Sequence, residues 1–190
     1  MTETDETMTR EELHFRRIDM RGWKRADGLF EIEGRVTDRK PHEFTSPGGT
    51  KVVPAGAPIH DMTVKLVIDQ EMCVVDVSAT THSAPYADCV SATGTLQVLK
   101  GLRIAGGWSR EVRNRLGGAQ SCTHLMEILT PMATAAYQSL TMARLGRPDS
   151  LDSNGKPLKV DSCFAYASNR GVVMRRWPAY YTGGKSTESD

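Results

Sequence analysis

Apolar and polar residues alternate along four segments in the first half of the chain. These segments cover residues 15–25, 29–39, 61–68 and 72–80. In the second of them Phe30, Ile32 and Val36 alternate with polar residues, as in a strand with one buried and one solvated face. Asp27-Gly28 lies between the first two segments and is a typical hairpin turn. The pattern therefore predicts four strands joined by short turns.

After residue 80 the spacing of apolar residues changes to the period of a helix. Helices are predicted over residues 87–99, 109–116 and 121–145. The longest has an inward stripe formed by Leu125, Ile128, Leu129, Met132, Ala136 and Leu140. Ser121 is expected to cap its start, and Pro131 is expected to kink it. A last hairpin is predicted from strands at 163–167 and 172–177.

Strands followed by helices predict an α+β protein, with an antiparallel sheet and three helices on one face. The first and last hairpins then flank the core. Residues 40–58 are rich in Pro and Gly and are expected to form a loop, whose length is typical of a functional segment such as a lid. We expect a single domain over residues 13–182, a disordered lead-in at 1–12 and a disordered tail at 183–190.

Composition excludes some classes of partner. The formal net charge is +1, whereas nucleic-acid-binding proteins usually carry a clear basic excess. No apolar stretch approaches the ~20 residues of a membrane helix. The four cysteines are widely spaced and no export signal is present, which predicts free thiols and a cytoplasmic protein. The aromatic segment 177–181 offers a surface on which a second copy could pack, so a homo-oligomer is considered.

Six short motifs are distributed along most of the chain. They are Arg17-Ile18-Asp19 with Gly22, residues 27–34, His60-Asp61-Met62, residues 101–104, residues 115–118 and residues 122–125. As a set they resemble a bacterial family catalogued as a domain of unknown function (DUF2889), over residues 15–180. Members of that family tend to lie among genes for the breakdown of aromatic, steroid-like or terpenoid compounds. The resemblance therefore implies a catabolic, partly apolar substrate.

Residues 56–61, the strand ending in Val67-Ile68-Asp69 and the start of the long helix at Cys122 are similar to the core of NifU-like iron–sulfur scaffold proteins. That resemblance covers residues 56–140. Two of the ligand cysteines of those scaffolds have no counterpart: Ile59-His60 stands at the position of the first, and residues 84–86 lie near the position of the second, with Cys89 about one turn too late. Iron–sulfur clusters need several thiolate ligands, so assembly of such a cluster is not expected. What the resemblance implies is that the loops at residues 60 and 82–86 and the helix start at 122–124 meet at one place.

The side chains at this meeting point are suited to acid–base chemistry. Imidazole exchanges protons near neutral pH, a carboxylate can orient it, and a phenol or an arginine can stabilise a developing negative charge on oxygen. The expected catalytic residues are His60, Asp61, Tyr86 and His124. The expected substrate-binding residues are Arg16, Arg17, His82, Arg103 and Cys122. Each also has a structural interpretation; for example, Cys122 could be a small buried residue near a helix start.

No cofactor and no bound metal are expected. The glycines at 106–107 and 117–118 do not form a dinucleotide fingerprint after a strand. His60, His82 and Cys122 are acceptable zinc ligands in type, as is Asp61, but their spacing matches no compact motif. We therefore expect a cofactor-independent lyase, catalysing elimination or retro-aldol loss of a small aldehyde from an aromatic or other partly apolar small molecule. The alternatives are a metal-binding or assembly protein that retains a NifU-like role, or a structural accessory subunit.

Overall fold

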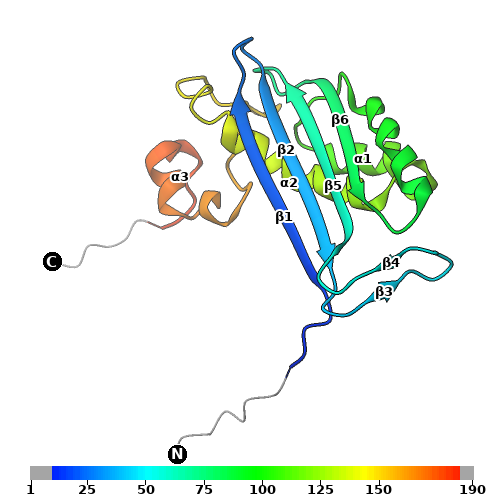
Figure 1. Ribbon diagram of the computed structural model, residues 1–190. Helices are drawn as coiled ribbons and strands as arrows, with labels where there is room; N and C mark the ends of the chain where they lie inside the picture. Colours follow the sequence, from blue (N-terminus) through cyan, green and yellow to red (C-terminus); the bar gives the residue numbers. More distant parts are fainter. Residues whose placement is uncertain (1–9, 185–190) are drawn as a thin grey trace, which may run out of the picture. The chain divides into compact units, whose positions relative to one another are not determined.

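A four-stranded antiparallel sheet forms the centre of the computed structural model, which describes residues 10–184. Its strands are β1 (Phe15–Lys24), β2 (Phe30–Arg39), β5 (Pro58–Ile68) and β6 (Val74–Ser83), in the order β1-β2-β5-β6 (Figure 1). Each strand pairs with the one before it, and Gly28 takes the positive φ of 85° that the first hairpin turn requires. The predicted α+β class with an antiparallel sheet is confirmed.

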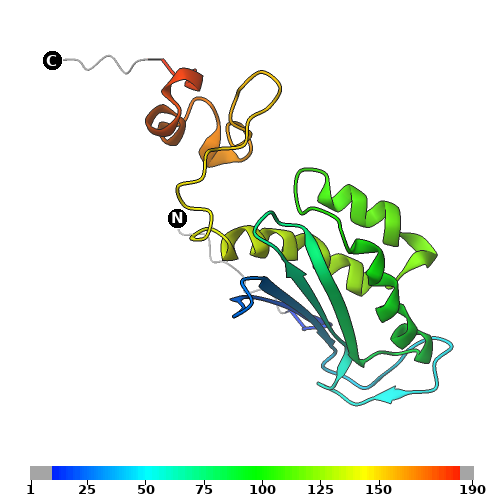
Figure 2. The ribbon, with the colours of Figure 1, turned by 90° about the horizontal axis from the view of Figure 1, so that it is seen from above.

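Three helices cover one face of this sheet (Figure 2). The 3-10 helix η1 (Ala87–Leu99) packs beside β6, and α2 (Thr123–Ser139) lies across β1, β2 and β5. The helix α1 (Trp108–Leu116) packs against the other two, and the short 3-10 turn η2 (Gly118–Gln120) leads into α2. The hydroxyls of Thr93 and Thr95 donate to the carbonyls three residues earlier, which suits the tighter winding of η1.

The core lies between the sheet and the helices. All six residues of the expected α2 stripe are fully buried, as are the inward residues Ile32, Met62, Val64 and Leu66. Gly34 permits the close approach of α2, because a Cβ atom there would lie 2.9 Å from the Cγ of Met132. The helix is shorter than predicted: it begins at Thr123, with Cys122 rather than Ser121 at the N-cap, and it ends at Ser139. Pro131 lies inside it; the kink expected there stays a prediction.

Both strands near the expected site extend into segments predicted as loops. β5 begins at Pro58, so that His60 belongs to a strand, and β6 continues to Ser83 and includes His82. The segment 40–58 contains a small two-stranded sheet of β3 (Phe44–Thr45) and β4 (Val52–Val53). An irregularity in the pairing of β5 with β6 near Val67 places Val74 and Val77 inward and leaves Val75 exposed. The strict alternation expected over residues 72–80 is therefore interrupted at Val75.

The hairpin predicted for residues 163–177 was also wrong. The chain there forms the 3-10 turn η3 (Phe164–Tyr166) and the helix α3 (Gly171–Arg176), followed by the 3-10 turn η4 (Pro178–Tyr180). Val173 and Trp177 are four residues apart and therefore share a helix face, which packs on Val160 in a small core of its own. That burial outweighs the local strand preference of two adjacent valines.

The chain divides into two compact units, residues 1–144 and 145–190. In the second unit Asp149 accepts a hydrogen bond of 2.9 Å from the indole of Trp177 and pairs with Lys159 and Arg176. The expected single domain over residues 13–182 stays a prediction. Most of the residues expected to be disordered at the two ends (1–9 and 185–190) lie outside the described part of the chain. None of the described helices has the length and apolar character needed to cross a bilayer.

Candidate active site

The inward face of the sheet changes from apolar to charged at one end. Asp38 lies two residues beyond the buried Val36, and His60 lies two residues before the buried Met62, so both side chains face the helices. Arg16 of β1 pairs with Asp38 in the strand register, and Asp38 pairs with His60. Three strands therefore bring an arginine, a carboxylate and an imidazole together in one cross-strand row.

Asp38 is the centre of this cluster and is only 2% exposed. Arg16 donates to both of its oxygens, from Nε at 2.7 Å and from Nη2 at 2.9 Å, and also binds Glu127 of α2 at 2.6 Å. His14 Nε2 lies 3.0 Å from Oδ1. Burial by itself raises the pKa of Asp38, but the hydrogen bonds and charge of Arg16, together with the two imidazoles, hold it below its ordinary value. Asp38 is therefore ionised at neutral pH.

His60 and His124 stack against each other beside this carboxylate. Their ring centroids are 3.7 Å apart with an interplanar angle of 28°. His60 Nδ1 lies 3.1 Å from Asp38 Oδ2, and His124 Nε2 lies 3.6 Å from the same oxygen. Burial lowers the pKa of His60, the charge of His124 lowers it further, and Asp38 only partly opposes both effects. His60 is therefore neutral at pH 7, with Nδ1–H donated to Asp38 and the lone pair of Nε2 free to accept a proton.

Cys122 joins the cluster from the N-cap of α2. Its Sγ atom lies 3.8 Å from His124 Nδ1 and 3.9 Å from the sulfur of Met62. Burial raises the pKa of this thiol, but hydrogen bonds from His124 and from the backbone N–H groups of Leu125 and His124 outweigh burial and bring it below 9.0. The thiol is therefore a polarisable group that borders the imidazole pair.

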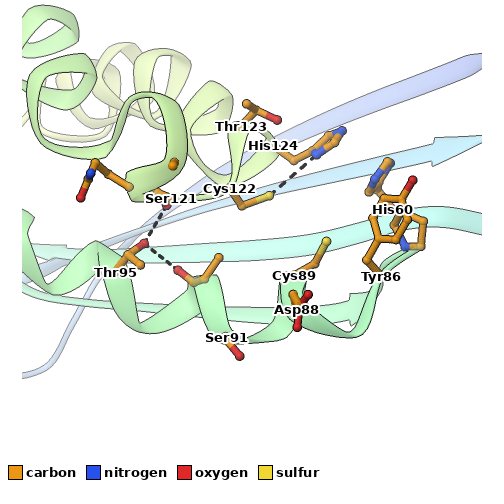
Figure 3. A pocket seen from close by; sticks show the side chains of 14 residues that line it. His60, Tyr86, Asp88, Cys89, Ser91, Thr95, Ser121, Cys122, Thr123 and His124 are labelled. Atoms are coloured by element: carbon orange, nitrogen blue, oxygen red, sulfur yellow. Dashed lines mark hydrogen bonds between the residues drawn. The ribbon is translucent and has the colours of Figure 1, made fainter. Parts of the chain in front are cut away.

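A cavity of about 540 Å³ opens beside the two imidazoles (Figure 3). Its wall is formed by His60, Pro85, Tyr86, Asp88, Cys89, Ser91, Ala92, Thr95 and residues 119–124. The volume is typical of sites for small molecules. Asp88 is the only acidic residue in this wall, and no Lys or Arg of the described chain contributes to it. The arrangement therefore favours an uncharged, partly apolar ligand next to a proton donor and acceptor.

Four of the residues predicted from sequence line this cavity: His60, Tyr86, Cys122 and His124. The phenol of Tyr86 donates to the carbonyl of Pro47 at 2.9 Å, so it also ties the segment 40–58 to the cavity wall. Arg16 reaches the site through Asp38 rather than by lining the cavity.

Three other predicted residues lie on the opposite, open face of the sheet. Asp61 and Arg17 are each adjacent in sequence to a site residue, and neighbouring residues of a strand point to opposite faces. Asp61 is bound there by Arg35 at 2.6 and 2.7 Å, and Arg17 pairs with Asp19. His82 lies 3.2 Å from the hydroxyl of Thr63 on that face. The expectation that Asp61 lines the cavity with His60 is therefore corrected.

Arg103 lies at a different part of the sheet. Its Nε donates to the carbonyl of Glu71 at 2.9 Å, and its backbone pairs with Cys73 next to the start of β6. The cavity begins where β6 ends, near Pro85. Arg103 is thus placed to hold the turn between β5 and β6 and not to bind a ligand in this cavity.

Asp38 and His14 were missed from the sequence. A signal for Asp38 was present, because it continues the alternation through Phe30, Ile32 and Val36 and so places a charge on the buried face of a strand. A buried carboxylate needs compensating partners. That requirement could have pointed to Arg16 and His60 as its neighbours.

The coupling of the two imidazoles predicts a specific titration of His60. We expect its midpoint, measured by NMR of the ring nitrogens, below the ordinary value of 6.5. His124→Gln removes a charge that lowers this pKa and should move the midpoint upward, whereas Asp38→Asn removes a charge that raises it and should move it downward. Because the folded pKa is below the unfolded one, this group contributes stability above about pH 6.5 that is lost as the pH falls through the folded pKa. A midpoint above 6.5, or shifts of the opposite sign, would contradict this account of the site.

Residues 14–138 match the model of a family described as "Protein of unknown function (DUF2889)". The matched region contains the whole sheet, nearly all of α2 and every residue of the cluster. It is shorter than the span to residue 180 expected from the motifs. No curated protein and no solved structure matches the chain, and the remote similarity to NifU-like scaffolds stays a prediction. Because the match covers well over half of its residues, the chain belongs to the DUF2889 family.

Proposed function

We propose that this protein is a cofactor-independent acid–base enzyme, a lyase that acts on an aromatic or other partly apolar catabolic substrate. The observation that carries the proposal is the pair of stacked imidazoles at the cavity wall, one of which is held by the buried Asp38. Two imidazoles in contact resist simultaneous protonation. One can therefore accept a proton while the other donates one.

Retro-aldol cleavage needs a base, an acid and a hydrogen-bond donor to the enolate oxygen, and the imidazole pair supplies the first two. His60 Nε2 takes the proton of a primary hydroxyl in a β-hydroxy ketone, and the bond between the hydroxymethyl carbon and its neighbour breaks. The hydroxymethyl group leaves as formaldehyde, and the electron pair of the broken bond passes into the ketone as an enolate. The proton held by the imidazole pair then returns to the carbon of the enolate, from His60 itself or by way of the stacked His124, so the pair carries no more than one added proton at any time. Elimination of water from the same substrate would use the same base and acid, with the hydroxyl as the leaving group.

A screen with simple aryl ketones tests this proposal. The purified protein would be incubated with a panel of 3-hydroxy-1-arylpropan-1-ones in buffer without cofactor. We expect either formaldehyde with the aryl methyl ketone, or water with the aryl vinyl ketone, identified by aldehyde derivatisation and mass spectrometry. The double variant His60→Gln/His124→Gln should be inactive. Equal product formation with this variant would refute the proposal.

A metal-binding function is the second candidate, because Asp38, His60 and His124 offer ligand atoms within 4.8 Å of one another. Two features weigh against it. Imidazoles that share one ion direct their lone pairs at a common point ~2 Å from each nitrogen, whereas nearly parallel stacked rings direct them side by side. In addition, Arg16 already occupies both oxygens of Asp38. Stoichiometric zinc or iron in the purified protein, lost in His60→Gln and in His124→Gln, would replace the lyase proposal with this one.

A further inference from the structure

The cavity has a second polar end, away from the imidazole pair. It is formed by the hydroxyls of Thr95 in η1 and Ser121 before α2, which lie 2.7 Å apart (Figure 3). Both residues line the cavity and are partly buried. The wall also includes the apolar side chains of Ala92 and Ala119. A ligand that reaches from the histidines across this wall meets the hydroxyl pair.

The direction of the hydrogen bonds in this pair follows from counting protons. A hydroxyl group has one proton to donate and two lone pairs that accept. Thr95 donates its proton to the carbonyl of Ala92 at 2.7 Å. The bond between the two hydroxyls must therefore be donated by Ser121 and accepted by Thr95. The result is a chain that runs from Ser121 to Thr95 to the Ala92 carbonyl.

This series of hydrogen bonds uses the only proton of the Ser121 hydroxyl and leaves both lone pairs of its oxygen available. Within the described residues, no protein N–H or O–H donates to the oxygen of Ser121. Asp88, the acidic residue in the cavity wall, lies in the first turn of η1 beside Tyr86, near His60 and away from Thr95 (Figure 3). The hydroxyl end of the cavity therefore offers the lone pairs of Ser121, and no lysine or arginine of the described chain lines the cavity.

We propose that this end recognises a neutral hydrogen-bond donor on the substrate, such as a phenolic or alcoholic hydroxyl, with Ser121 as the acceptor and Thr95 as the positioning residue. The inference rests on the proposed function of the same site and names its substrate class. A methyl ether at that position has no proton to donate and would place its oxygen against a lone pair of Ser121. A site built to hydrogen-bond a hydroxyl rejects the analogue that lacks it, because its buried polar group is then left unpaired.

A matched pair of ligands tests the inference without turnover. The probes are 4-hydroxyphenyl methyl ketone and 4-methoxyphenyl methyl ketone, whose binding to the wild-type protein is measured by NMR titration or calorimetry. We expect the hydroxyl compound to bind roughly tenfold more tightly, as one hydrogen bond allows. Ser121→Ala should bring the ratio close to one. Thr95→Val should also reduce the ratio, because it frees the proton of Ser121 to turn toward the ether oxygen.

Ser91→Ala is the control, since it removes another hydroxyl from the cavity wall without touching the chain of hydrogen bonds. It should leave the ratio unchanged. Circular dichroism and thermal unfolding of each variant report whether it is folded. Equal binding of the two compounds to the wild type, an unchanged ratio in Ser121→Ala, or no binding of either compound at millimolar concentration would overturn the inference.

The two proposals fail separately. If the ligand preference is absent but His60→Gln still stops turnover, recognition by Ser121 is wrong and the acid–base proposal stands. If the preference is present and depends on Ser121 while His60→Gln turns over normally, the acid–base proposal is wrong and recognition by Ser121 stands.

Discussion

Replacing His60 with Gln should lower turnover at least about 10²-fold and leave the fold intact, because a positioned general base contributes about 10²–10⁴ in rate. Gln keeps a polar side chain that can still meet Asp38, but it has no lone pair of comparable basicity to take the place of Nε2. The loss should appear in kcat, measured with any ketone that the aldehyde screen identifies. Circular dichroism would confirm that the variant is folded.

His82→Gln is the matched control for this experiment. It removes an imidazole from the neighbouring strand, but on the open face of the sheet, where His82 meets Thr63 rather than the cavity. We expect wild-type turnover. Cys122→Ser should have a milder effect than His60→Gln, because the thiol borders His124 without being cast as the nucleophile. If Cys122→Ser abolished activity and His60→Gln did not, the chemistry would be thiol-based.

Asp38→Asn should weaken both folding and catalysis. The variant keeps the shape of the side chain but loses the charge that Arg16 and His60 meet, and the Asp38 carboxylate is nearly inaccessible to solvent. We expect a loss of about 2–4 kcal/mol in the free energy of unfolding, typical of breaking a buried charged network. Turnover should fall about 10²-fold or more, because the imidazolium formed at His60 is no longer stabilised. Urea unfolding and steady-state kinetics measure the two effects.

Asp61→Asn provides the comparison. Asp61 is also paired with an arginine, but Arg35 is exposed on the open face of the sheet. An ion pair with an exposed partner contributes about 1 kcal/mol or less, and Asp61 has no path to the cavity. Asp61→Asn should therefore lower the free energy of unfolding only slightly and leave turnover unchanged. If the two variants lost equal stability, or if Asp61→Asn were the one that lost activity, the assignment of Asp38 as the centre of the site would fail.

Lowering the pH should destabilise the folded protein through both Asp38 and His60. The pKa of Asp38 is held below its ordinary value of 3.8, so its contribution to stability is present above about pH 4 and is lost as the pH falls through the folded pKa. The lowered pKa of His60 acts with the same sign at a higher pH. The cluster should therefore lose stability in two stages on acidification, first at the imidazole and then at the carboxylate.

The sequence by itself determined the class of fold and most of its core. Period-two alternation identified the inward rows of β2 and β5, and the helical period identified the stripe of α2, because burying an apolar face imposes a repeat that is visible in the chain. The same reasoning failed at residues 163–177. That segment is short, and its few apolar residues fit either period, so the small core around Val160 and Trp177 decided its structure.

The candidate site was only partly determined by the sequence. His60, Tyr86, Cys122 and His124 were selected as residue types suited to proton transfer, and they meet along one cavity. Asp61 and His82 were included because they lie in the segments that the NifU-like resemblance brought together, but neighbouring positions of a strand face opposite sides of the sheet. For Asp61 this followed from the strand predicted over residues 61–68, because Asp61 is adjacent to the inward Met62. For His82 only the tertiary structure showed that β6 continues to Ser83, which decides the side on which His82 lies.

The central role of Asp38 was likewise decided by pairing between strands. Asp38 lies 22 residues after Arg16, and His60 lies 22 residues after Asp38. At this separation no local pattern connects the three residues. The register of β1, β2 and β5 sets them side by side, and α2 then adds His124 above them. Alternation specifies which face a side chain occupies, whereas register and helix placement specify which side chains it meets, and these depend on contacts between segments distant in the chain.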